Sequence, residues 1–152
     1  MKTLTAFLTI TFLASAAAFS ADFPKGSPVF EHNLSDALAK AKKDNKPVIA
    51  IFSAVWCGPC QTMKHDVYPS DAVKPYLDKF VWAYLDADSS SNQASMKKFG
   101  VSGIPHIEFL DKDGKSLGKQ VGSSSADSFA KTLEDILKKA GSAATTAAAD
   151  KK

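Results

Sequence analysis

The sequence predicts a single α/β domain in which a mixed central β-sheet is flanked by helices. Val48–Phe52 and Phe80–Leu85 have the continuous hydrophobicity of strands that are buried on both faces of a sheet. Segments of helical character join these two strands, which favours parallel pairing between them. Nearer the C-terminus, His106–Leu110 and Ser116–Val121 flank the turn Asp111–Lys115 and predict an antiparallel hairpin.

The N-terminal part of this domain is expected to enter the sheet through a helix. Residues Asp22–Asn33 contain proline and glycine and predict a lead-in with a short extended piece at Val29–Phe30. Ser35 is the expected N-cap of a helix that ends near Lys43. The polar segment Asp44–Pro47 is then expected to turn the chain into the first buried strand.

A second helix is predicted directly after the first buried strand. It should run from Cys57 to about Val67. Pro69–Ser70 is expected to break it before a short helical piece that ends near Asp78.

Two further helices are expected after the second buried strand. A polar loop, Asp86–Asn92, leads to a short helix, Gln93–Phe99. The last helix should begin near Ser124, where Asp127 fits a capping box, and end at Gly141.

The length of 152 residues suits one domain with a sizeable core, and a hydrophobic content of 45% excludes a disordered chain. We expect a signal peptide over residues 1–20, the α/β domain over 22–141 and a disordered tail over 142–152, which holds no large apolar side chain. All 19 basic residues are lysines, at a formal net charge of +3. Because recognition of phosphates and bases depends heavily on arginine, no nucleic-acid partner is expected.

The N-terminal segment has the features of a secretory signal peptide. Lys2 precedes an apolar stretch from Leu4 to Phe19, and small residues permit cleavage after Ala18 or after Ser20. An uncleaved membrane anchor is the alternative, although the stretch is near the lower length limit for a bilayer. We therefore expect an exported, soluble protein, in the periplasm or alternatively secreted, with its cysteines outside the cytosol.

The only two cysteines of the chain lie in the sequence Trp56-Cys57-Gly58-Pro59-Cys60, after the first buried strand. Cys57 is expected at a helix N-terminus, where free N–H groups and the helix dipole favour the thiolate. Pro59 fits the first helical turn, where its missing N–H costs nothing. Cys57 is therefore the predicted nucleophile toward a partner's disulfide, and Cys60, one turn later, is the predicted resolving thiol of a redox-active disulfide.

Other interpretations of this cysteine pair remain open. A structural disulfide would close a very small loop and stabilise the chain little. A zinc site would need two more ligands, and His32, His65 and His106 do not have a paired spacing. Metal delivery by the cysteines and a non-catalytic binding module are further alternatives. The preferred redox interpretation requires no metal and no other cofactor.

Two motifs together resemble the thioredoxin family. The Trp-Cys-Gly-Pro-Cys sequence after an apolar strand is similar to the thioredoxin active site, and Gly103-Ile104-Pro105 precedes a strand as it does in that family. The resemblance covers about residues 35–140 and implies a thioredoxin-like fold. It further implies a cis Pro105 against the cysteines, substrate pairing by the backbone of Ile104, and Trp56 as a lid. The chain is most similar to exported domains such as the C-terminal domain of the membrane protein DsbD.

The sequence departs from the family pattern around the second cysteine. A buried aspartate of thioredoxins is Ile51 here, and the lysine that pairs with it is Tyr84. An acid that DsbD-type domains carry after the second cysteine is Lys64. The sequence therefore offers no obvious proton acceptor for Cys60.

These features predict an exported thiol–disulfide oxidoreductase that acts on protein disulfides, as a reductase rather than an oxidase. Gly58–Pro59 lacks the histidine that stabilises the reduced form of strong oxidants, so we expect a potential nearer to roughly −270 mV than to roughly −120 mV. An exported reductant needs a source of electrons, which implies a membrane donor of DsbD type. The mature form is expected to be a monomer.

Four other side chains near the motifs have simpler expected roles. Trp82 is expected in the core, Met63 in packing and His65 on the helix surface. His106 has two interpretations, an imidazolium that favours the Cys57 thiolate or a strand histidine that faces solvent or is satisfied by a partner. The second is the favoured interpretation.

Overall fold

The computed structural model describes residues 23–149, with side chains to Ser142, and contains one five-stranded sheet. The signal peptide predicted over residues 1–20 lies outside the described residues. The strands are β1 (Phe30–Glu31), β2 (Val48–Ser53), β3 (Val81–Asp86), β4 (His106–Leu110) and β5 (Ser116–Val121).

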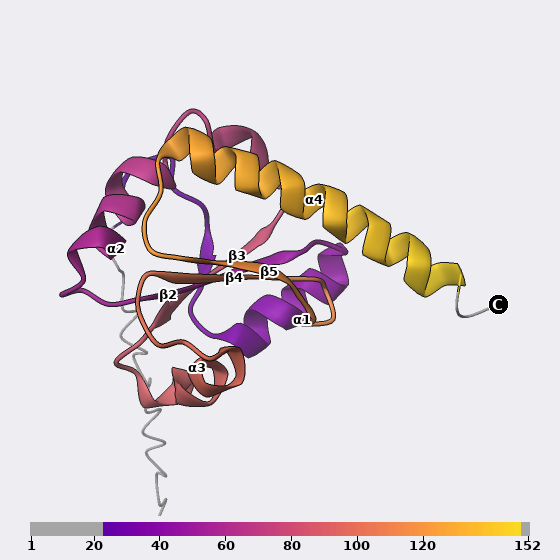
Figure 1. The fold of residues 1–152 in the computed structure, drawn as a ribbon, viewed down its shortest axis with the longest axis horizontal. Coiled ribbons are helices and arrows are strands. Elements are labelled where there is room, and N and C mark those ends of the chain that lie inside the picture. Colours follow the sequence, from indigo (N-terminus) through magenta and orange to yellow (C-terminus); the bar gives the residue numbers. More distant parts are fainter. Residues whose placement is uncertain (1–22, 150–152) are drawn as a thin grey trace, which may run out of the picture.

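Helices cover both faces of this sheet (Figure 1). The α-helices are α1 (Leu34–Asp44), α2 (Gly58–Thr62), α3 (Gln93–Phe99) and α4 (Ala126–Ala149). A π-helical turn, Met63–Val67, continues α2, and single 3₁₀ turns occur at Lys74–Tyr76 and Ser90–Asn92. Within the part of the chain described here, none of the helices has the length and apolarity that a membrane crossing requires.

The strand order is β1-β3-β2-β4-β5. β1, β3 and β2 run parallel, β4 is antiparallel to β2, and β5 is antiparallel to β4. The predicted fold class, a mixed sheet with parallel strands and a C-terminal antiparallel hairpin between helices, is confirmed. β2 and β4 are neighbouring internal strands that run antiparallel. The chain that leaves the C-terminal end of β2 therefore lies beside the chain that enters the N-terminal end of β4.

Each sheet face has its own apolar core. On one face, Ile49 and Ile51 of β2 pack with Trp82 of β3 and with Phe129 and Leu133 of α4. The other face buries the alternate residues of the same strands beneath α1, with α3 at its edge. Since β2 is buried along its whole length, its continuous apolar sequence is the one expected for a central strand.

The start of α1 differs from the prediction by two residues. Asn33, in extended conformation, is the N-cap, and its Oδ1 accepts a hydrogen bond of 2.8 Å from the backbone N of Asp36. Ser35, the expected cap, lies inside the helix and donates its hydroxyl to the same Oδ1 atom at 2.7 Å. The helix begins early because Leu34 is buried against the sheet, so its backbone already belongs to the first turn.

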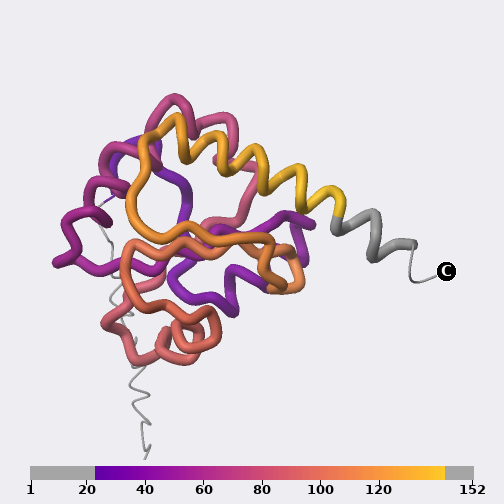
Figure 2. Tube along the Cα trace, viewed as in Figure 1, coloured from indigo at the N-terminus to yellow at the C-terminus, as the bar shows by residue number. Residues whose placement is uncertain are grey.

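The predicted helix from Cys57 to Val67 is present, in two forms. Cys57 itself is the N-cap, α2 makes a single regular turn, and the π-helical turn completes the element. After Pro69, only the short 3₁₀ turn follows, in place of a helical piece to Asp78. Figure 2 shows the indigo lead-in passing beside the magenta segment that contains the π-helical turn. There the ammonium of Lys64 lies 4.6 Å from the centre of the Phe23 ring.

The last helix starts and ends later than predicted. Ser125 caps it, because its Oγ accepts from the backbone N of Ser128 at 3.3 Å, and α4 begins at Ala126. The helix continues past Gly141 to Ala149, so the prediction of a stop at Gly141 is wrong. A glycine lowers helix stability by only about 1 kcal/mol relative to alanine, and the segment beyond it is rich in alanine.

Candidate active site

A disulfide joins Cys57 to Cys60 at the carboxyl end of β2, where α2 begins. The two Cα atoms are 5.2 Å apart. Cys57 Sγ accepts a hydrogen bond of 3.3 Å from the backbone N of Cys60, as the cap of α2. Cys57 is 5% exposed and Cys60 is 1% exposed. A sulfur at this position is close to the unpaired N–H groups of a helix start, which stabilise a negative charge.

The turn before β4 lies directly against this disulfide. The Sγ atom of Cys57 is 3.7 Å from the carbonyl oxygen of Ile104, although 47 residues separate the two in sequence. The Ile104–Pro105 peptide bond is cis, as the resemblance implies. Ile104 packs against Ala54 and both cysteines, and the carbonyl of Pro105 accepts a hydrogen bond of 2.8 Å from the N–H of Gly122.

Exposed apolar side chains occur just before the disulfide in sequence and at the end of β5. Trp56 is 68% exposed, and its Nε1 donates to Asp88 Oδ2 at 2.7 Å. Val55 is 86% exposed, and Val121, next to Gly122, is 59% exposed. The sequence did not reveal Asp88 as the partner of Trp56, because it is one of two acids in a polar loop, and it lies 32 positions after Trp56.

The three residues that depart from the family pattern each have other partners. Ile51 is fully buried in the core beneath α4. The ammonium of Lys64 lies over the ring of Phe23. The hydroxyl of Tyr84 lies 2.5 Å from Ser53 Oγ, and burial is the main cause that raises the pKa of Tyr84. None of these three side chains supplies a carboxylate at the position where the family has one.

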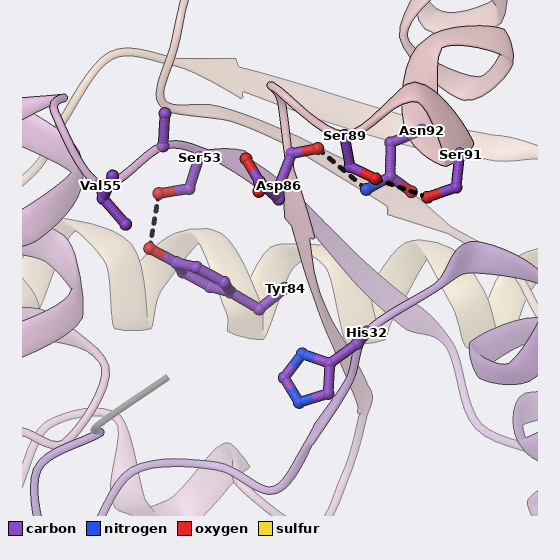
Figure 3. Close-up of a pocket in the computed structure, with 9 residues that line it drawn as sticks. His32, Ser53, Val55, Tyr84, Asp86, Ser89, Ser91 and Asn92 are labelled. Carbon is purple, nitrogen blue, oxygen red and sulfur yellow. Dashed lines mark hydrogen bonds between the residues drawn. The ribbon is translucent and has the colours of Figure 1, made fainter. Parts of the chain in front are cut away.

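A cavity of about 360 Å³ adjoins the segment that leads to Trp56. Figure 3 shows the Tyr84 hydroxyl directed at Ser53, with Val55 beside this pair and His32 entering from the loop after β1. The complete lining consists of His32, Ser53, Ala54, Val55, Tyr84, Asp86, Ser89, Ser91 and Asn92. This volume is at the lower end of the range of about 300–1,000 Å³ that small-molecule pockets have.

His106 is buried and paired. It is 1% exposed, and its Nε2 lies 3.2 Å from Glu108 Oε2, so the interpretation as a satisfied strand histidine is confirmed. Trp82 is in the core and His65 is exposed, as predicted. Met63 is also buried, and its sulfur accepts from the backbone N of Ser124 at 3.4 Å. Residues 23–142 contain no group of three or more His, Cys, Asp or Glu side chains placed to hold a metal ion.

The arrangement of the cysteines and the turn agrees with comparisons to known proteins. A family model described as a thioredoxin-like domain matches residues 34–137. The chain belongs to the thioredoxin-like domain family. The chain is similar to the chloroplastic thioredoxin-like protein HCF164 of Arabidopsis thaliana, with 36% identity over 83 residues. The alignment covers 55% of this chain and 31% of that protein. The chain thus spans about a third of the length of the curated relatives of this kind.

Two solved structures extend the comparison to the whole domain. A thioredoxin from Thermus thermophilus has a TM-score of 0.68 at 26% identity, over 76% of this chain and 92% of that one. The oxidised C-terminal domain of DsbD from Neisseria meningitidis has a TM-score of 0.60 at 26% identity, over 71% of this chain and 99% of that domain. The fold of this chain is therefore similar both to that of a thioredoxin and to that of a DsbD C-terminal domain.

Proposed function

We propose that this protein is a thiol–disulfide oxidoreductase that exchanges its Cys57–Cys60 pair with disulfides of partner proteins. The observation that carries the proposal is the position of the disulfide, which lies at the start of α2 and against the carbonyl of Ile104. A disulfide with a purely structural role needs neither a position at the start of a helix nor a neighbouring turn such as the one before β4. The names of the relatives, thioredoxin and thiol–disulfide interchange protein, support the same chemistry.

The reaction begins with the reduced pair. The Cys57 thiolate attacks one sulfur of a partner disulfide, so that a mixed disulfide forms and one partner thiolate leaves. The Cys60 thiolate then attacks Cys57 Sγ, which forms the Cys57–Cys60 disulfide and releases the second partner thiolate. Two electrons pass to the partner, which is reduced as the pair is oxidised.

The burial of the two sulfurs supports this division of roles. Cys57 is the more exposed of the pair and caps the helix, whereas Cys60 is 1% exposed and packs inside the site. A protein disulfide approaches Cys57 across the exposed ring of Trp56 and the backbone of Ile104. An extended segment of the partner is expected to pair with that backbone, since Ile104 lies just before β4 and outside its hydrogen-bonded ladder.

The direction and the location of the reaction form the second part of the proposal. The Gly58–Pro59 dipeptide between the cysteines favours a relatively reducing pair. Together with the apolar N-terminal segment that follows Lys2, this supports an exported reductase that acts as a soluble monomer in the periplasm. Electrons for such a protein come from a membrane donor of DsbD type, and the structural likeness to a DsbD domain supports that donor.

Insulin reduction with dithiothreitol as the electron source tests the chemistry. The wild-type protein is expected to accelerate insulin precipitation, and Cys57→Ser is expected to abolish the acceleration. Cys60→Ser keeps the nucleophile and should instead accumulate mixed disulfides, visible as higher bands on non-reducing gels. Full activity of Cys57→Ser contradicts the proposal, and an absence of trapped species in Cys60→Ser removes the resolving role.

A non-catalytic binding module is the second candidate, and Ile51 and Lys64 are the features that favour it. Both stand where an acid would assist proton transfer from the resolving thiol. Replacement of both cysteines by alanine separates the candidates in the host cell. Retention of full biological function in this double variant selects the binding module, whereas loss of function selects the oxidoreductase.

A further inference from the structure

Two titratable side chains are buried on β4, immediately after the turn that contacts Cys57. His106 is 1% exposed and Glu108 is 4% exposed. The Nε2 atom of His106 lies 3.2 Å from Glu108 Oε2, and the hydroxyl of Ser116 on β5 donates to Glu108 Oε1. These three side chains are called the β4–β5 polar cluster below. They belong to neither the disulfide nor the surface around it.

The fold does not require polar groups at these positions. The cross-strand neighbours of His106 and Glu108 on β2 are Phe52 and Ala50, which are both fully buried. Burial of ionisable groups in such surroundings costs free energy unless each one is hydrogen-bonded. Apolar side chains of similar volume stabilise a strand as well or better. Stability alone therefore does not account for the β4–β5 polar cluster.

The location of the cluster points to the turn before β4. His106 is the first residue of β4 and follows Pro105 directly. A backbone hydrogen bond of 2.8 Å already ties Pro105 to Gly122, just beyond the end of β5. The hydrogen bond between Ser116 and Glu108 adds a side-chain tie between the same two strands. The His106 ring also lies 6.0 Å from the ring of Phe52, on the strand that leads to Cys57.

We propose that His106 and Glu108 are positioning residues that fix the start of β4, so that Ile104 presents its backbone to an extended protein substrate beside Cys57. The inference rests on the proposed function. It adds that His106 and Glu108 help the protein to select protein disulfides over small disulfides. Neither side chain reaches the substrate, since both are buried. The β4–β5 polar cluster therefore acts on docking of a polypeptide and leaves the exchange between sulfurs unchanged.

Two disulfides of different size test this inference. Under this proposal, reduction of insulin requires an ordered backbone at Ile104. Reduction of the small aromatic disulfide dithiobis(nitrobenzoate) requires only access to the Cys57 thiolate. Glu108→Gln and His106→Gln are expected to lower kcat/KM for insulin about tenfold and to leave the rate constant with the small disulfide within about twofold. His65→Gln, which removes an exposed imidazole on the π-helical turn, is the matched control and should change neither rate.

Each outcome decides the inference. Equal losses of rate with insulin and with the small disulfide would place the effect on Cys57 or on folding and would overturn the inference. Rates unchanged from wild type with both disulfides would also overturn it. If Glu108→Gln fails to fold by circular dichroism, Ser116→Ala supplies the test, because it keeps both buried groups and removes only the hydroxyl. Ser116→Ala should show a smaller loss for insulin alone, and a wild-type rate would overturn the inference. A wild-type protein that reduces neither disulfide would refute the proposed function instead.

Discussion

The Sγ atom of Cys57 lies 3.7 Å from the carbonyl oxygen of Ile104. The two residues follow β2 and precede β4, which are adjacent antiparallel strands, with Phe52 opposite His106. The backbone carbonyl of the turn therefore contacts the sulfur, and the side chain of Ile104 packs against the same cysteines. A partner's polypeptide that pairs with this backbone is brought to the sulfur that attacks its disulfide.

Replacement of Ile104 by alanine tests the role of the backbone. The carbonyl remains, and only apolar contacts with Ala54 and the cysteines are lost. We expect kcat/KM for insulin reduction within about threefold of the wild-type value, equal to about 0.7 kcal/mol. A tenfold or larger loss in a folded Ile104→Ala protein would show that the side chain contributes to docking.

Replacement of Trp56 by alanine should separate activity from stability. The indole is 68% exposed, so the free energy of unfolding is expected to change by at most about 1 kcal/mol, mainly through the bond to Asp88. The apolar surface beside Cys57 is lost, and the KM for insulin should rise several-fold. Val29→Ala removes another exposed apolar side chain, in the lead-in, and is the control expected to leave KM unchanged. Equal KM values for the two variants would contradict this role of Trp56.

Tyr68→Phe is expected to stabilise the protein. Tyr68 is 1% exposed, and its hydroxyl has no hydrogen-bond partner among the described residues. Removal of a buried unpaired hydroxyl eliminates a desolvation penalty, so the free energy of unfolding should increase by about 1 kcal/mol. Urea denaturation monitored by tryptophan fluorescence measures the change. A destabilised variant would indicate that a water molecule satisfies the hydroxyl.

Stability is expected to fall in alkaline solution. Burial is the first cause that raises the pKa of both Tyr68 and Tyr84, so the folded protein holds these protons more tightly than the unfolded chain. This contribution is fully present below the ordinary tyrosine pKa of about 10 and decreases as the pH rises above it. Urea denaturation between pH 8 and 11, values that bracket a pKa of about 10, measures the decrease. Tyr68→Phe should reduce this decrease, and a slope identical to wild type would contradict the assignment.

Two glycines should respond to alanine substitution with opposite signs. Gly141 lies within α4 at an exposed position, so Gly141→Ala is expected to increase the free energy of unfolding by up to about 1 kcal/mol. Gly100 closes α3 at a φ of +64°, a left-handed conformation, so Gly100→Ala should lower it by about 1 kcal/mol. Thermal unfolding followed by circular dichroism compares them. A stabilising Gly100→Ala would contradict this account of the helix end.

Local patterns in the sequence determined most of the secondary structure. The continuous apolar residues of β2 and β3, the turn before β5 and the cysteine pair after β2 each lie within a few neighbouring residues, and the structure has them where they are expected. The errors are at helix ends. Asn33 replaced Ser35 as a cap, and α4 passed Gly141, because packing of the first turn and an alanine-rich continuation outweigh a single residue's preference.

Only the tertiary structure decided which distant residues meet. The contact of Cys57 with Ile104 and the bond from Trp56 to Asp88 join residues separated by 47 and 32 positions. The sequence suggested the first pair through the family resemblance and did not indicate the second. The hydrogen bond from Ser116 of β5 to Glu108 of β4 also depends on the register of these two strands. Hydrophobic periodicity specifies the face of a strand, but the choice of neighbour arises from the packing of the whole sheet between its two layers of helices.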